Sequence, residues 1–97
     1  MNELTGIQRD IVYSISGVEE PYGLGIKRKL QEYRGEEINH GRLYPNLDQL
    51  VEKGFVDKKA KDRRTNLYTL TDHARKAMEE RRAWENNQMS DQAPVSH

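Results

Sequence analysis

Four polar side chains recur at helical spacing in the segment HGRLYPNLDQLVEKG, residues 40–54. They are Arg42, Asn46, Gln49 and Lys53. At about 100° per residue these positions form one stripe along a helix, on the side turned away from the leucines of the segment. Arginine can pair with guanine through two hydrogen bonds, asparagine and glutamine can do the same with adenine, and lysine suits phosphates. The stripe therefore fits contact with nucleic acid, although the same residue types are common on a solvated helix face.

Positive charge is concentrated directly after this stripe. From Lys53 to Arg64 the sequence holds six cations against two anions, in a chain whose 16 basic and 16 acidic residues cancel overall. Such a cluster favours binding to phosphates, and the other interpretation is a flexible, soluble turn. The cations expected to bind phosphates are Lys59, Lys61, Arg63 and Arg64.

The chain lacks the residues that several kinds of chemistry require. It contains no cysteine, and its three histidines, at positions 40, 73 and 97, share no metal-ligand spacing. No phosphate-binding glycine loop or nucleophile motif is present. We therefore expect no enzyme activity, no metal and no cofactor. No apolar run is long enough to cross a bilayer and no signal peptide is recognised, which predicts a cytoplasmic protein without membrane contact.

Capping residues and apolar spacing predict three helices before the basic segment. Thr5 followed by Gln8 is a capping-box pattern that starts a first helix, which should end near residue 16. A second helix is expected over residues 24–34, ended by Gly35. Asn39 is a suitable N-cap for a third helix over residues 40–53. Its buried side is expected to consist of Leu43, Leu47, Leu50 and Val51.

Pro45 lies inside this third helix and raises two interpretations. It removes the backbone donor that would bond to the carbonyl of Gly41, and it presses against that carbonyl. Because Gly41 absorbs distortion easily and adds no side chain, a bent first turn with His40 and Arg42 could approach a groove closely. The other interpretation is that Pro45 makes the helix start late.

After Gly54 the apolar period changes from that of a helix to that of strands. FVDKKA and NLYTL alternate around the polar stretch KDRRT, which predicts a hairpin with a charged tip, residues 57–66. Thr71 then caps a final helix over about residues 72–86, and residues 87–97 are expected to be a disordered polar tail. The predicted fold is mainly α with a small β-hairpin, in the order helix, helix, helix, hairpin, helix. This is a winged helix-turn-helix domain over residues 1–86.

The segments GRLYPNLDQLVEKGFV and RRTNLYTLTDHARKAMEE resemble the core of PadR-like transcriptional regulators. In that family a Leu-Tyr pair opens the recognition helix, a Leu-x-x-Leu-x-x-x-Gly run closes it, and an Arg…Tyr-x-Leu-Thr segment forms the second wing strand. The resemblance covers about residues 5–82 and is strongest to short haloarchaeal members. Two departures are Ala74, where the family usually has glycine, and a net charge of zero, which is less acidic than expected of a salt-adapted protein.

The final helix carries a thin apolar stripe with small residues first and one tryptophan last. In the family that the chain resembles, the C-terminal helix pairs subunits, which implies a homodimer. The residues expected at the dimer contact are Tyr13, Ala77, Met78, Arg81 and Trp84. The alternative is that this helix packs only on its own subunit and leaves Trp84 exposed.

The resemblance and the residues together predict a homodimeric repressor that binds double-stranded DNA in a sequence-specific way. Residues 40–53 would read the major groove of an inverted-repeat operator, and the wing, residues 57–66, would contact the backbone or the minor groove. The residues expected at DNA are Asn39, His40, Gly41, Arg42, Asn46, Gln49, Lys53, Lys59, Lys61, Arg63 and Arg64. Two other uses of the fold stay open: a protein-interaction module whose basic hairpin binds an acidic partner, and a non-specific DNA-coating protein.

Overall fold

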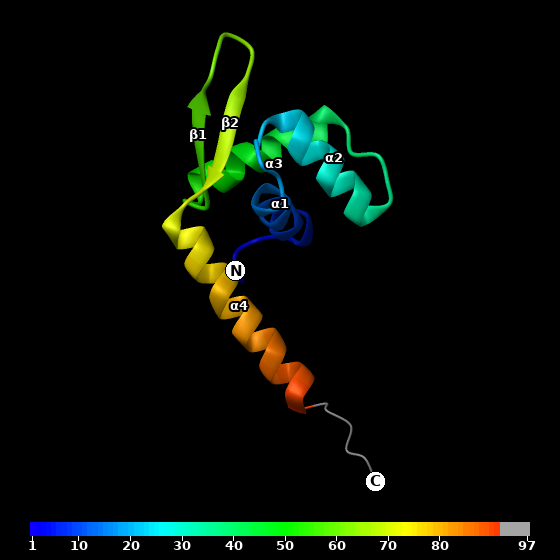
Figure 1. Ribbon diagram of the computed structural model, residues 1–97, viewed down its shortest axis with the longest axis vertical. Coiled ribbons are helices and arrows are strands. Elements are labelled where there is room, and N and C mark those ends of the chain that lie inside the picture. The colour runs from blue at the N-terminus through cyan, green and yellow to red at the C-terminus, as the bar shows by residue number, and fades with distance from the viewer. Residues whose placement is uncertain (92–97) are drawn as a thin grey trace.

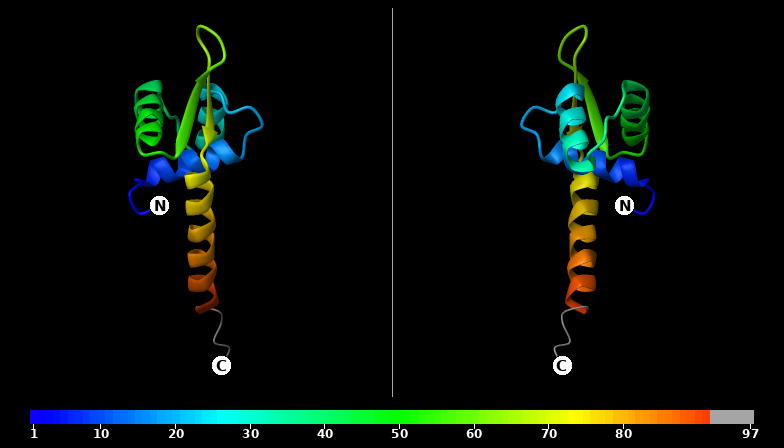
Figure 2. Two further views of the ribbon diagram at one scale, coloured as in Figure 1. Left: turned by 90° about the vertical axis from the view of Figure 1, so that its left-hand side faces the viewer. Right: turned by 90° about the vertical axis from the view of Figure 1, so that its right-hand side faces the viewer.

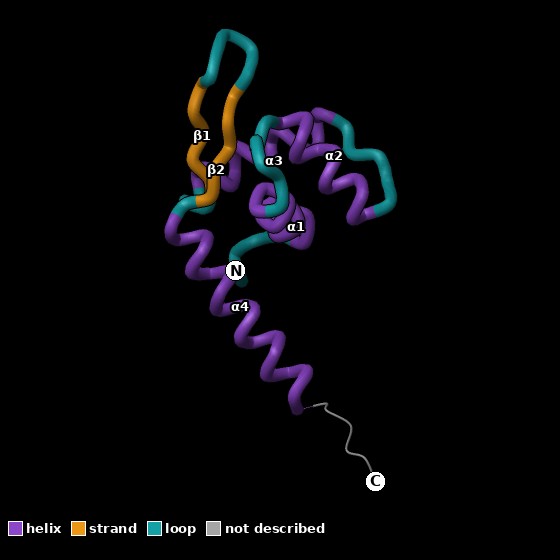
Figure 3. The backbone as a smooth tube through the Cα atoms, in the orientation of Figure 1, coloured by secondary structure: helices purple, strands orange, loops and turns teal. Residues whose placement is uncertain are grey.

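The computed structural model describes residues 1–91 of the 97-residue chain. Helices α1 (Gly6–Ser16), α2 (Gly23–Arg34) and α3 (His40–Glu52) come first, followed by the antiparallel strands β1 (Val56–Ala60) and β2 (Asn66–Leu70) and then by helix α4 (Asp72–Asp91). The first three helices and the hairpin form one body, and α4 projects from it on the side opposite the hairpin tip (Figures 1 and 3). The order of elements predicted from the sequence is confirmed.

Local capping explains where the helices begin and end. The Thr5 hydroxyl accepts a hydrogen bond from the backbone N–H of Gln8 (3.3 Å), and the Gln8 amide oxygen accepts one from the N–H of Thr5 (3.2 Å), which completes the predicted capping box. Asn39 caps α3 by accepting from the N–H of Arg42 at 2.9 Å. Gly35 ends α2 with a φ of 68°, a left-handed conformation that glycine adopts at little cost.

Pro45 lies well inside α3. The helix already begins at His40, and the N–H groups of Arg42 and Leu43 both bond to the carbonyl of Asn39. The interpretation in which the proline delays the start of the helix is therefore wrong. The first turn is wound and capped before the proline is reached, so the missing donor of Pro45 interrupts only one bond inside a helix that continues to Glu52.

The core lies where α1, α2, α3 and the base of the hairpin meet. Among its fully buried side chains are Ile11, Val12, Ile26, Leu30, Ile38, Leu43, Leu47, Leu50 and Phe55. The hairpin is attached to this body by backbone bonds as well as by Tyr68, which is 2% exposed. Tyr22 forms an isolated antiparallel bridge with Leu67, and the N–H of Tyr68 bonds to the carbonyl of Pro21 at 2.9 Å. The segment before α2 thus supports the wing.

Helix α4 is longer than the sequence analysis predicted. It continues to Asp91, so residues 87–91 are helical although they were expected to belong to a disordered tail, and residues 92–97 lie outside the described residues. The reason is that a polar composition argues against a packed core but not against a helix, and Gln88 and Met89 in this stretch are good helix formers. In residues 1–91 no helix is long and apolar enough to cross a membrane.

Candidate nucleic-acid interface

Helix α3 lies beside the hairpin (Figure 2). Leu43, Leu47 and Leu50 turn into the core and are completely buried, whereas the first turn of the helix is exposed. An ion pair between Asp48 of α3 and Lys58 of β1, with 3.6 Å between the charged atoms, joins the two elements. Helix α3 and the wing therefore form one continuous surface.

The four polar residues predicted from helical spacing do share one side of α3, and that side flanks α1. Arg42, Gln49 and Lys53 are exposed, and Asn46 is half-buried. Gln8 of α1 reaches this side: its Nε2 donates to Oδ1 of Asn46 at 3.1 Å and to Oε1 of Gln49 at 2.7 Å. Lys53 Nζ in turn donates to Oε1 of Gln8 at 2.9 Å. Three of the four predicted residues thus converge on one buried amide.

Gln8 was recognised in the sequence only as a capping residue. It is 1% exposed and lies on the buried side of α1 with Ile11, Val12 and Ile15. Positions 8, 11, 12 and 15 follow the i, i+3, i+4, i+7 spacing, so a polar amide in a buried stripe was the signal that could have found it. A buried polar group is nearly always hydrogen-bonded. The partners of Gln8 here are side chains of α3, which is the helix expected to read the bases and is called the reading helix below.

The side of α3 farthest from the buried leucines carries two carboxylates. Gly41, Pro45, Asp48 and Glu52 are all exposed there. Asp48 is paired with Lys58. Because this side of α3 carries two carboxylates, it is not a strongly cationic surface. The positive charge that attracts a polyanion must come from the wing and from the flank of α3.

Arg42 stands at the exposed start of α3 and is paired with an acidic residue. Its Nη1 lies 3.1 Å from Oε1 of Glu36, and the same carboxylate oxygen lies 3.5 Å from Nε of Arg34. The Arg42 side chain remains 46% exposed. Surface pairs of this kind contribute only about 0–1 kcal/mol, so Arg42 can exchange Glu36 for another anion or a base at low cost.

The wing carries its cations on exposed positions around a hydrogen-bonded turn. The Asp62 carboxylate accepts from the N–H of Arg64 at 2.9 Å, and the N–H of Lys61 bonds to the carbonyl of Thr65 at 2.8 Å. The N–H of Arg64 also lowers the pKa of Asp62 below its ordinary value. Within residues 1–91, Lys59, Arg63 and Arg64 have no carboxylate within 4.0 Å, and all three are exposed. Their charge is therefore not neutralised inside the molecule.

Lys61 differs from the other wing cations because it contacts an aromatic ring. Its Nζ donates to the Tyr22 hydroxyl and lies 4.8 Å from the centre of the Tyr22 ring. The hydrogen bond to Tyr22 raises the pKa of Lys61. Because Tyr22 directly precedes α2, this contact connects the tip of the wing to the start of that helix. Lys61 is exposed, and its charge still adds to the positive field of the wing.

The residues predicted for subunit contact fall into two groups. Ala77 is 8% exposed and belongs to the core of the chain itself, so its assignment to a subunit contact is wrong, and Met78 packs against the same core. Tyr13 and Trp84 are exposed to 37% and 56%, and the Arg81 guanidinium lies 5.8 Å from the Trp84 ring. The surface that remains for a partner is therefore Tyr13 on α1 together with Arg81 and Trp84 on α4.

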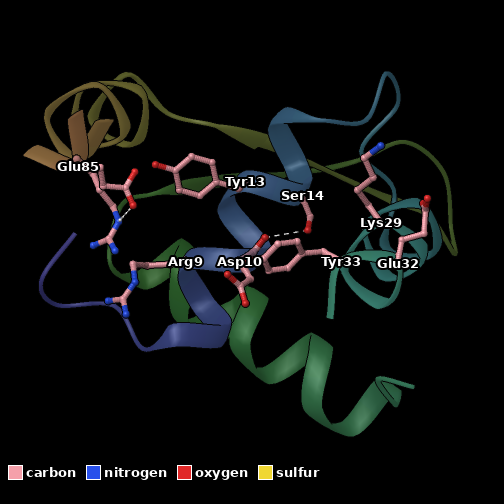
Figure 4. A pocket seen from close by; sticks show the side chains of 9 residues that line it. Arg9, Asp10, Tyr13, Ser14, Lys29, Glu32, Tyr33 and Glu85 are labelled. Atoms are coloured by element: carbon pink, nitrogen blue, oxygen red, sulfur yellow. Dashed lines mark hydrogen bonds and ion pairs between the residues drawn. The ribbon is translucent and has the colours of Figure 1, made fainter. Parts of the chain in front are cut away.

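A hollow of about 680 Å³ adjoins this surface (Figure 4). It lies between α1, α2 and the projecting helix α4, and Figure 4 shows Arg9 and Tyr13 on the side toward Glu85, with Lys29, Glu32 and Tyr33 on the side of α2. Its lining residues are Arg9, Asp10, Tyr13, Ser14, Lys29, Glu32, Tyr33, Arg81 and Glu85. Three basic and three acidic side chains make the hollow electrically balanced.

Comparison with known protein families gives a decisive match. The model of the transcriptional regulator PadR-like family matches residues 11–80. The chain belongs to the PadR-like family. It is thus a DNA-binding transcriptional regulator, as the resemblance predicted, and its winged-helix fold is the fold of such regulators. No curated protein matches the chain in sequence.

Solved structures of a haloarchaeal regulator resemble this PadR-like chain closely. RosR in the complex named hsRosR-S1 is 48% identical with a TM-score of 0.84, over 90% of this chain and 77% of that chain. RosR of H. salinarum grown from NaBr is 49% identical with a TM-score of 0.83, over 89% of this chain and 77% of that chain. The predicted similarity to haloarchaeal members of the family is confirmed.

The fold of this PadR-like regulator also occurs in a more distant protein. ZitR of Lactococcus lactis, a zinc-responsive MarR family member, is 23% identical with a TM-score of 0.66, over 92% of this chain and 58% of that chain. At this identity the likeness shows the fold alone. Residues 1–91 of the present chain contain no group of three or more histidine or acidic residues placed to hold a metal ion.

Proposed function

We propose that this PadR-like regulator is a homodimeric repressor of an inverted-repeat operator. Residues 40–53 would enter the major groove, and the wing, residues 57–66, would contact the backbone or the minor groove. The observation that carries the proposal is that three exposed cations without acidic partners, Lys59, Arg63 and Arg64, lie on a hairpin that is joined to α3 by the Asp48–Lys58 pair, while the first turn of α3 is exposed. A cationic hairpin packed against a helix with an accessible start is suited to hold a duplex while the helix contacts its bases.

The leading turn of α3 is the part best suited to enter a groove. His40, Gly41 and Arg42 are exposed there, and Gly41 adds no side chain that would keep the backbone away from DNA. The Asn39 side chain already accepts the N–H of Arg42 as an N-cap, which leaves its amide nitrogen for contact with a phosphate or base. Gln49 and Lys53 would act further along the same flank, and Asn46, the most enclosed of these residues, would mainly support them.

The wing would supply most of the attraction that does not depend on sequence. Each phosphate neutralised by a lysine or arginine releases counterions, so the logarithm of affinity falls with the logarithm of salt by about 0.9 per contact. Contacts from Lys59, Arg63 and Arg64 would give a slope near −3, and Lys61 would add to it if it leaves Tyr22. Binding of any duplex should therefore weaken steeply as salt is raised.

The proposed dimer would use the projecting part of α4 and the adjoining side of α1. Trp84 and Met89 expose large apolar side chains at 56% and 72%, on a helix whose buried residues Ala74 and Ala77 lie in its first turns and which then projects from the body (Figure 1). A balanced set of charges in the neighbouring hollow suits contact between two identical surfaces, as two-fold symmetry requires. Two reading helices related by such an axis would lie about 34 Å apart, one helical turn of DNA.

Selection of bound sequences from a random pool of DNA duplexes tests the proposal. The expected result is an enriched inverted repeat with half-sites about one helical turn apart, bound roughly 10³-fold or more tightly than random duplex. Retention of all sequences equally would indicate a DNA-coating protein, and absence of binding at low salt would indicate a protein-interaction module. Enrichment of a single half-site without its inverted copy would contradict the dimer.

A further inference from the structure

We infer that Gln8, buried between α1 and α3, sets which hydrogen-bonding groups the reading helix presents to DNA. The inference rests on the proposed function, because it states whether Gln49 donates or accepts the hydrogen bond when it contacts a base. Gln8 is a positioning residue in this scheme, since it is 1% exposed and does not itself reach DNA.

The orientation of the Gln8 amide follows from the chemistry of its neighbours. Lys53 Nζ lies 2.9 Å from Oε1 of Gln8, and the backbone N–H of Thr5 lies 3.2 Å from the same oxygen. An ammonium group and a backbone N–H can only donate, so they require an oxygen at this place. The nitrogen of Gln8 must then be on the other side, facing Asn46 and Gln49.

The orientation of Gln8 in turn fixes its two partners on α3. The two hydrogens of Nε2 can only be donated, and they are received by Oδ1 of Asn46 at 3.1 Å and Oε1 of Gln49 at 2.7 Å. Two donors and two acceptor positions of Gln8 are then all occupied, which stabilises a polar group inside the core. Reversal of either partner would place an N–H against an N–H.

Asn46 and Gln49 are left in different states by this network. The Nδ2 of Asn46 donates to the carbonyl of Arg42 at 2.7 Å, so both ends of this amide are bonded within the protein. Gln49 is exposed, its oxygen is turned toward Gln8, and its Nε2 has no partner among residues 1–91. The flank of α3 therefore presents Gln49 as a donor, in place of the two-point partner for adenine that the spacing suggested.

A donor in the major groove selects bases by their acceptors. Guanine presents two acceptors, O6 and N7, and thymine presents O4, whereas adenine has its N7 acceptor next to the N6 donor and cytosine presents only the N4 donor. We expect Gln49 to favour guanine or thymine over cytosine at the position that it contacts, by about tenfold. Lys53, held by Gln8 and by the carbonyl of Glu3 (2.9 Å), would lie beside it as a second donor.

The variant Gln8→Glu tests the inference because it keeps the two acceptors toward Thr5 and Lys53 and removes both donors. Gln49, whose nitrogen has no partner among the described residues, should then turn that nitrogen toward the carboxylate, so that its Oε1 faces the duplex, whereas Asn46 stays held by the carbonyl of Arg42. Selection from a random duplex pool with the full chain should show guanine or thymine replaced by cytosine, which the wild-type chain disfavours, at one position of each half-site. The matched control is Gln31→Glu, where the same change retains the acceptor for the N–H of Ile38 (2.9 Å) and should leave the selected sequence unchanged.

The possible outcomes separate this inference from the proposed function. A wild-type chain that selects an operator while Gln8→Glu selects the same bases overturns the role of Gln8 and leaves the proposed function standing. The same holds for a uniform loss of affinity across all sequences, which is what a merely structural role of Gln8 predicts. A wild-type chain that selects nothing overturns both. In Gln8→Met, which removes donors and acceptors together, the preference at that position should fall to about twofold or less.

Discussion

The ring of Tyr44 on α3 lies directly against the backbone of Gly23, the first residue of α2. A β-carbon at position 23 would stand 2.9 Å from Cζ and 3.0 Å from Cε1 of the ring, and closer still to the hydroxyl oxygen. The two helices of the helix-turn-helix can meet at this point because residue 23 has no side chain. Tyr44 also packs edge-on against His40, with 5.5 Å between ring centres. Because His40 is the first residue of α3, the fit of Tyr44 against Gly23 also affects the position of the first turn of α3.

Replacing Gly23 with alanine should therefore destabilise the fold by about 1–3 kcal/mol, the usual cost of overpacking. The measurement is urea denaturation followed by circular dichroism. Gly6 is the matched control, since it is also the first residue of a helix and a β-carbon there would meet nothing within 4 Å. Gly6→Ala should be neutral or slightly stabilising, because alanine favours helix. In a Tyr44→Ala background Gly23→Ala should cost nothing, and a loss that persists there would contradict the contact.

The sequence could predict most of the local structure because capping and periodicity act over a few residues. Thr5, Asn39 and Gly35 do what their types predict at helix ends. The stripe on α3 was also found by spacing, but its environment was not, because spacing does not tell which other element flanks a helix. Gln8 and Asn46 are 38 residues apart in the chain, and only the packing of α1 against α3 brings them together.

The end of α4 shows a different limit. The polar residues after Trp84 carry no apolar stripe. The periodicity of apolar residues therefore could not predict that the helix continues through them to Asp91. Helix propensity gives no firm extension either, because Gln88 and Met89 favour a helix while Asn86, Asn87 and Ser90 do not. Propensity also says nothing of what the helix packs against. Ala77 was predicted to contact a partner subunit for a related reason. The sequence of a helical stripe is the same whether its small residues are covered by the core of the chain, as Ala77 is, or by another subunit.

The double substitution of Arg63 and Arg64 by alanine should weaken binding to operator and random duplexes alike. Each arginine that contacts a phosphate contributes about 0.9 to the salt dependence, so the slope should become shallower by up to about 1.8. Fluorescence anisotropy titrations at several salt concentrations measure both quantities. Arg75→Ala with Lys76→Ala is the control, because it removes the same charge from exposed positions on α4. If affinity and slope stayed at their original values, the wing would have no part in binding.

Trp84→Ala should weaken self-association by about tenfold or more, since buried tryptophans are common hot spots of interfaces. The residue is 56% exposed in a single chain, so its removal should change the free energy of unfolding of the monomer very little. Sedimentation velocity over a range of concentrations measures the change. Glu79→Ala, an exposed α4 residue away from the Trp84 side, should leave the association constant unchanged. A wild-type chain that stays monomeric at every concentration would refute the dimer itself.

The turn at the tip of the wing should depend on pH through Asp62. The N–H of Arg64 lowers the pKa of this carboxyl below its ordinary value of 3.8, so the turn is stabilised above that value and loses this support as the pH falls through the lowered pKa. The backbone amide resonance of Arg64 in nuclear magnetic resonance spectra should therefore shift in the acid range, following the protonation of Asp62. In Asp62→Asn the side-chain oxygen can still accept the N–H of Arg64 but does not titrate, and the resonance should stay constant over the same range. An Arg64 resonance that is constant in the wild-type chain, or that shifts equally in both, would show that the carboxylate does not hold the turn.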